Sequence, residues 1–161
     1  MGNKPYITRA CLIIEIVSYL ILFITAVVCI FVMIHTDGPI PTHYDFHGNV
    51  DSYGPAASLL IVPCTMLFTN LIISLCLHLV KPEHWNTPFK IKPGHETIIL
   101  HDMTLMMVVL ELVLSLWALA TTIDWGVGNG DMIFPLSMIM VVVTFVVIFG
   151  FTLLAAKHNK E

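Results

Sequence analysis

Charged residues are scarce in this sequence of 161 residues, and their scarcity argues against a water-soluble fold. Asp, Glu, Lys and Arg together make up 11% of the chain, whereas hydrophobic residues make up 57%. A typical soluble domain is about 25% charged, because its surface faces water. So few charges cannot cover such a surface. We therefore expect the lipid bilayer to surround most of this protein.

Sequence motifs of the common enzyme classes are also missing. There is no nucleophile elbow, no H-E-x-x-H pair and no phosphate-binding loop, so we do not expect an enzyme. The four cysteines lie in or beside the first two apolar stretches, without zinc-type spacing, and imply no disulfide. A net charge of −4 gives no reason to expect a nucleic-acid partner.

Four long apolar stretches are what the sequence has instead. They cover approximately residues 12–34, 56–80, 98–123 and 132–156. A helix of about 20 residues crosses the hydrocarbon core, and within lipid a helix satisfies its own backbone hydrogen bonds. The first stretch exceeds the roughly 7–15 apolar residues of a signal peptide, so we expect it to be retained. The sequence predicts an all-α membrane protein: one domain, residues 1–161, forming a four-transmembrane-helix bundle.

The basic residues indicate how this bundle is oriented. Lys and Arg occur only in the N-terminus, in the loop 81–97 and in the C-terminus, and neither of the other two loops contains one. Positively charged loops remain in the cytoplasm. We therefore expect a multi-pass protein of the cell membrane with both termini inside and the loop 36–54 outside. The seven basic residues are Lys4, Arg9, Lys81, Lys90, Lys92, Lys157 and Lys160.

The outer loop, residues 36–54, is the most distinctive segment. Pro39 and Pro41 favour an extended conformation at its start, and Gly48-Asn49 favours a turn. We therefore expect an ordered loop between the first two helices.

Four side chains of this loop could bind a divalent metal ion. In an extended segment alternate residues share a face, so His43, Asp45 and His47 would point the same way, with Asp51 just past the turn. A zinc-like cation accepts such nitrogen and oxygen ligands. Alternatively, these groups bond the backbone of the loop and cap the second helix, switch with protonation, or contact a ligand directly.

Residues about 10–80 resemble the N-terminal module of the SdpI-type membrane proteins, which include immunity proteins that protect bacteria from a secreted toxic peptide. The resemblance lies in the pattern I-P-x-H, a short spacer, and G-x-x-D-x-aromatic-G before a transmembrane helix. It implies an outer loop that meets an extracellular peptide. The matching residues here are Ile40, Pro41, His43, Gly48, Asp51, Tyr53 and Gly54.

Glu111 is the most costly residue to place in lipid, because it lies near the middle of the third apolar stretch. Desolvation disfavours the anion, so we expect a protonated side chain that faces the bundle interior. Asn70 in the second stretch lies at a similar depth. The two residues either join helices by hydrogen bonds or form a proton or ion relay.

Three functions are compatible with these features. The resemblance favours a small bacterial membrane protein of immunity or sensing type, whose outer loop meets an extracellular peptide or ion. The first alternative is an ion or small-molecule transporter that uses Glu111 and Asn70, for which four helices per chain would require a homo-oligomer. The second is a metal-dependent membrane protein that uses His43, Asp45, His47 and Asp51.

Overall fold

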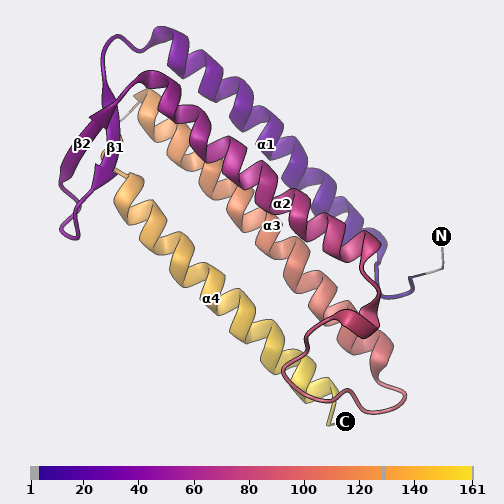
Figure 1. Cartoon of the computed structure of the whole chain (residues 1–161). Helices are drawn as coiled ribbons and strands as arrows, with labels where there is room; N and C mark the ends of the chain where they lie inside the picture. Colours follow the sequence, from indigo (N-terminus) through magenta and orange to yellow (C-terminus); the bar gives the residue numbers. More distant parts are fainter. Residues whose placement is uncertain (1–3, 128–129, 161) are drawn as a thin grey trace.

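The computed structural model describes residues 4–127 and 130–160, and four long helices dominate it (Figure 1). Each helix is long and apolar enough to cross a membrane, as expected for a multi-pass membrane protein. The helices extend beyond most of the predicted boundaries by a few residues, because capping residues at their ends are polar and escape a hydropathy argument. The helices are α1 (Arg9–His35), α2 (Ile61–Leu79), α3 (Glu96–Val127) and α4 (Ile133–His158).

The second apolar stretch begins differently from the prediction. Residues Ala56–Leu60 form a 3-10 helix, η1, and α2 starts only at Ile61. Pro63 is the third residue of α2, in the first turn, where its missing N–H removes no intrahelical hydrogen bond. A single continuous helix over 56–80 is therefore replaced by a short 3-10 segment followed by the α-helix.

Helix α3 is central to the bundle. It packs against α1, α2 and α4, whereas α4 packs mainly on α3 and buries only Ile133 and Ala155 among its described residues. Small and hydroxyl-bearing residues occupy the buried face of α3, and large apolar side chains on all four helices point outward. This distribution suits lipid, where small residues allow close helix contacts. The buried residues on this face include Thr104, Ser115, Ala118, Thr121 and Thr122.

The outer loop is not merely extended, because it forms a β-hairpin. Strand β1 (Ile40–Tyr44) pairs antiparallel with β2 (Val50–Gly54), with an irregularity around His43. The residues predicted to form an ordered outer loop form this hairpin, so the all-α description does not extend to this segment. Prolines favour the extended conformation of β1, and Gly48 adopts a φ of +84° in the turn.

The bundle has two distinct ends (Figure 1). We call the end that carries the hairpin, residues 36–60, 124–127 and 130–133, the hairpin end. The opposite end holds both described termini and the segment 80–95, and we call it the terminal end. Here Asn159 joins α4 to that segment, because its side chain accepts from Lys92 N at 2.8 Å and donates to Lys90 O at 2.9 Å.

Gly126 allows α3 to approach α1 closely at the hairpin end. A Cβ atom at Gly126 would lie 2.7 Å from Val32 Cγ2, and the branched Val32 side chain has little freedom to move. We expect Gly126→Ala to lower the free energy of unfolding by about 1–3 kcal/mol, as overpacking does. Thermal unfolding of the purified protein in detergent measures the effect.

Gly150→Ala is the matched control, because nothing lies within 4 Å of a Cβ atom at Gly150. This substitution should be neutral or stabilising, since Ala favours a helix over Gly by about 1 kcal/mol. Equal melting temperatures for the two variants would contradict the close contact at Gly126.

Candidate functional site

His43 and Asp51 meet across the hairpin. His43 Nδ1 lies 2.5 Å from Asp51 Oδ1, although eight positions separate the residues. Their side chains remain 69% and 47% exposed. Water screens an exposed pair of this kind, so it contributes little to stability. The contact therefore leaves both groups available to an external ligand.

Asp45 does not join this pair, because the turn uses its carboxylate. Asp45 Oδ1 accepts from His47 N and Asn49 N, each at 2.8 Å, and Oδ2 accepts from Asn49 Nδ2 at 3.0 Å. The side-chain hydrogen bond from Asn49, followed by the backbone donors, lowers the pKa of Asp45 below its ordinary value of 3.8. Strand alternation stops at the turn, so the predicted common face of His43, Asp45 and His47 is not formed in this way.

The remaining motif residues build the hairpin and its attachment. Pro41 is opposite Tyr53 in the strand register. Gly54 allows β1, β2 and η1 to lie close together, because a Cβ atom at this position would lie 2.7 Å from Thr42 Cγ2.

Tyr44 attaches the hairpin to the rest of the molecule. Its Oη donates to Gly130 O at 2.8 Å, which joins the hairpin to the link between α3 and α4. Burial, and then the nearby Asp124 and Asp131, raise the pKa of Tyr44.

A cavity of about 530 Å³ lies between the hairpin and the ends of α1 and α3. Asp37 and Asp131 supply carboxylates to its wall, and Tyr53 and Trp125 supply aromatic rings. No Lys or Arg lies among its lining residues. The cavity therefore presents negative charge and aromatic surface together, and the strands that carry His43 and Asp51 contribute Pro41, Val50 and Tyr53 to its wall.

Metal ligation is only partly supported by this arrangement. Two of the four predicted ligands, His43 and Asp51, are in contact, while Asp45 is engaged in the turn. Within residues 4–127 and 130–160, no group of three or more His, Cys, Asp or Glu side chains is placed to hold a metal ion.

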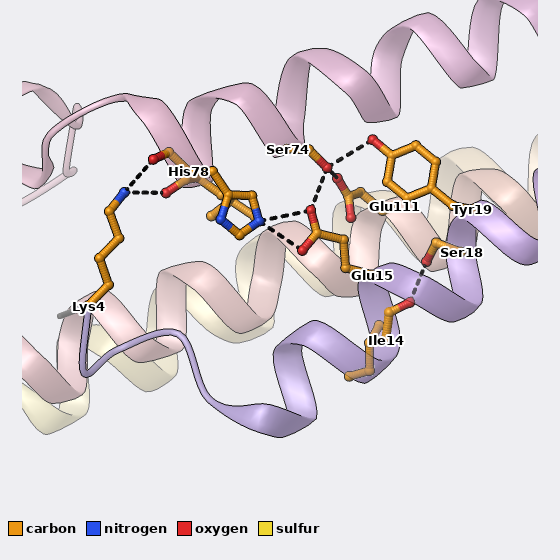
Figure 2. Close-up of polar contacts among 9 residues, drawn as sticks. Lys4, Ile14, Glu15, Ser18, Tyr19, Ser74, His78 and Glu111 are labelled. Carbon is orange, nitrogen blue, oxygen red and sulfur yellow. Dashed lines mark hydrogen bonds and ion pairs between the residues drawn. The ribbon is translucent and has the colours of Figure 1, made fainter. Parts of the chain in front are cut away.

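A second polar region lies inside the bundle, and Figure 2 shows most of it. Ser74 Oγ lies 2.6 Å from Glu15 Oε1, 3.0 Å from Glu111 Oε1 and 2.9 Å from Tyr19 Oη. His78 Nε2 lies 3.1 and 2.9 Å from the two Glu15 oxygens. We call these five residues and Asn70 the buried polar cluster.

Asn70 and Glu111, the intramembrane residues selected from the sequence, are both fully buried. Asn70 Nδ2 donates to Glu111 O at 3.2 Å and to Ser115 Oγ at 3.0 Å, so α2 and α3 are joined there.

Sequence reasoning missed the roles of Ser74 and Tyr19. The spacing of Asn70, Ser74 and His78, four residues each, could have revealed one polar face on α2. By contrast, nothing in the sequence pairs Tyr19 with this face, because that contact depends on how α1 packs against α2.

Comparison with known proteins adds one match. The model of a family described as a domain of unknown function (DUF1648) matches residues 20–67, and this domain occurs in SdpI-like membrane proteins. The matched segment runs from α1 through the hairpin into α2, so it includes the hairpin motif but not Glu15, Asn70, Ser74 or Glu111. No curated protein and no solved structure matches the chain.

Acid should loosen the hairpin turn through Asp45. A lowered folded-state pKa contributes stability above the unfolded pKa, and this contribution is lost as the pH falls through the folded value. We therefore expect the amide hydrogens of His47 and Asn49 to lose protection from exchange below about pH 4. Hydrogen exchange followed by NMR measures this protection.

The Asp45→Ala variant should show weak protection at these amides even at neutral pH. Asp37→Asn changes the charge of an exposed residue at the same end and should preserve the protection. Protection in Asp45→Ala equal to that of the wild type would contradict the role of this carboxylate.

Proposed function

We propose that this is a small bacterial membrane protein of immunity or sensing type, whose hairpin end meets an extracellular cationic peptide. In this proposal it lies in the cell membrane with both termini in the cytoplasm. Lys and Arg gather at the terminal end, which supports this orientation because positive residues stay inside. The hairpin end would then face the exterior.

The observation that carries the proposal is the acidic, aromatic cavity beneath an anchored hairpin. Asp37 and Asp131 line it, and Tyr53 is 62% exposed there. A cationic peptide with aromatic side chains is complementary in charge and in surface to such a wall. Because the hairpin is already ordered, binding would cost little further conformational entropy.

The motif residues support the same end of the molecule. The DUF1648 match at residues 20–67 contains Pro41, His43, Gly48, Asp51, Tyr53 and Gly54. The resemblance to SdpI-type immunity proteins rests on these positions, and they build the hairpin that borders the cavity.

A divalent metal ion is the alternative ligand at this end. His43 and Asp51 would supply one nitrogen and one carboxylate ligand, and the remaining positions would come from water or from the ligand itself. Asp45 and His47 would have to leave the present turn to complete the predicted set of four.

Peptide binding tests the proposal directly. We expect the chain in lipid nanodiscs to bind a short synthetic peptide of lysine and tryptophan residues, with an affinity that falls as salt is added. Asp37→Asn combined with Asp131→Asn should weaken binding by about three- to tenfold, because each exposed charge pair contributes roughly 0.2–1 kcal/mol. Fluorescence titration gives the dissociation constants.

Glu83→Gln combined with Glu96→Gln is the matched control, since it removes two exposed carboxylates at the terminal end.

In cells exposed to a toxic peptide, His43→Ala and Asp51→Ala should reduce survival. Full tolerance in both variants, together with unchanged peptide binding in the Asp37 and Asp131 double variant, would rule out the hairpin end as the site that meets the peptide.

A transporter is the second candidate function, and the buried polar cluster favours it. Glu111 and Asn70 are in contact in the bundle interior, where intramembrane carboxylates often mark ion pathways. One chain has only four helices, so this function would require a homo-oligomer to enclose a path.

Proton flux into liposomes distinguishes this candidate. We expect a pH-sensitive dye to report flux in the wild type and none in Glu111→Gln, because an amide neither binds nor releases a proton at neutral pH. The control Glu96→Gln should retain the wild-type flux. Equal flux in all three proteins would exclude Glu111 from the pathway.

A further inference from the structure

Ser74 has three oxygen neighbours but only one hydrogen to donate. Its Oγ lies within hydrogen-bond distance of Glu15, Glu111 and Tyr19 (Figure 2). A hydroxyl donates one hydrogen bond and accepts two. If Ser74 donates to one carboxylate and accepts from Tyr19, the other carboxyl group has to donate to Ser74. All three contacts are full hydrogen bonds only when one of the two glutamates carries a proton.

Glu15 has a hydrogen-bond partner besides Ser74. His78 Nε2 contacts both Glu15 oxygens, and its side chain is 39% exposed towards the terminal end. Lys4 Nζ donates to Leu77 O at 2.8 Å and to His78 O at 3.0 Å, which brings a positive charge to the same end of α2. Glu15 thus has a hydrogen-bond partner at each carboxyl oxygen, in contrast to Glu111.

The surroundings of Glu111 favour the neutral acid. Glu111 is fully buried, and its Oε2 has no hydrogen-bond partner among the described residues. Asn70 gives independent support: its amide nitrogen bonds the Glu111 backbone, and its own Oδ1 is buried without a donor. This region therefore contains more acceptors than donors. An additional proton relieves that imbalance, whereas an anion on Glu111 would worsen it.

We infer that Glu111 is a proton-binding site in the bundle interior, connected to the terminal end through Ser74, Glu15 and His78. In the connecting step Glu111 donates its proton to Ser74 Oγ while Ser74 donates its own to Glu15 Oε1. The net result is the movement of one proton from Glu111 to Glu15. Neutral His78, with its hydrogen on Nδ1, then accepts this proton at Nε2 and releases the Nδ1 hydrogen to water.

Among the described residues, no other titratable side chain on the helices packed around Glu111 replaces Ser74 and Glu15 as its partner. On α3, His101 Nδ1 contacts Tyr6 O at 3.0 Å, and Asp102 Oδ2 contacts His158 Nδ1 of α4 at 2.7 Å. Both contacts lie near the terminal end, more than two helical turns from Glu111 along the sequence. The cysteines of α1 and α2 are Cys11, Cys29, Cys64 and Cys76, and among the described residues none of them forms a hydrogen bond with Glu111.

This site is separate from the proposed peptide surface. The cavity under the hairpin is at the opposite end from His78, and the DUF1648 match includes none of Glu15, Ser74, His78 and Glu111. The inference concerns the resting protonation of the bundle, so it holds whether or not an ion crosses the membrane.

Infrared spectroscopy of the full chain in lipid nanodiscs tests the site. At neutral pH we expect the carbonyl band of a protonated carboxylic acid in the wild type, and we expect Glu111→Gln to lose it. Glu96→Gln, which changes an exposed carboxylate at the start of α3, should keep the band. Absence of the band from the wild type would overturn the inference, and no variant needs to fold for that outcome.

The connection to the terminal end has its own readout. Transfer into deuterated buffer should shift the band quickly in the wild type, and about 100-fold more slowly in Ser74→Ala, because positioned proton donors accelerate transfer by about 10²–10⁴-fold. Equal exchange rates would remove Ser74 from the path. A band that persists in Glu111→Gln but disappears in Glu15→Gln would show that Glu15 carries the proton, and this would overturn the inference that Glu111 does.

Discussion

The hydrocarbon interior of a lipid bilayer offers no hydrogen-bond partners, and the packing of the four helices follows from this constraint. Every polar group on the four helices has to find a partner within the chain or remain unpaired at a high free-energy cost. Several hydroxyl groups meet this requirement locally, as when Ser18 donates to Ile14 O and Thr122 donates to Ala118 O. Others, including Asn70 and Ser74, meet it across helices and so fix how α1, α2 and α3 pack.

The same constraint explains why α3 is central and α4 peripheral. Helix α3 carries Glu111 and a face of small and hydroxyl-bearing residues, which are stable only when other helices cover them. Helix α4 is almost uniformly apolar and is satisfied by lipid, apart from its contacts with α3 and the polar residues at its C-terminal end. Polar side chains such as Asn70 and Glu111 are therefore buried in this bundle, together with part of its apolar side chains, while many large apolar side chains face outward.

Polar chemistry is concentrated in two places with different physical character. At the hairpin end, His43 and Asp51 are exposed to water, which weakens their mutual attraction and leaves them open to a ligand. Within the bundle, Glu15 and Glu111 are buried around one hydroxyl group, where each proton has a large energetic effect. The proposed peptide binding uses the exposed groups of the hairpin end, and the proposed proton site uses the buried polar cluster.

Hydropathy alone predicts four helices and their approximate limits, because long apolar stretches in lipid have few alternatives to a helix. The sequence also drew attention to His43, Asp51, Asn70 and Glu111, since polar residues in unusual places carry information. It did not reveal that residues 40–54 pair as strands, because the pairing of His43 with Ser52 depends on the register across a turn.

Which polar groups come into contact depends on the tertiary structure. Asp45 and Asp51 look equivalent along the chain, yet the turn engages the first and the strand register brings the second to His43. Similarly, Glu15 and Glu111 are distant in sequence and become neighbours because α1, α2 and α3 pack around Ser74. Hydropathy and local spacing describe each segment separately, whereas these contacts depend on the relative rotation of helices about their axes.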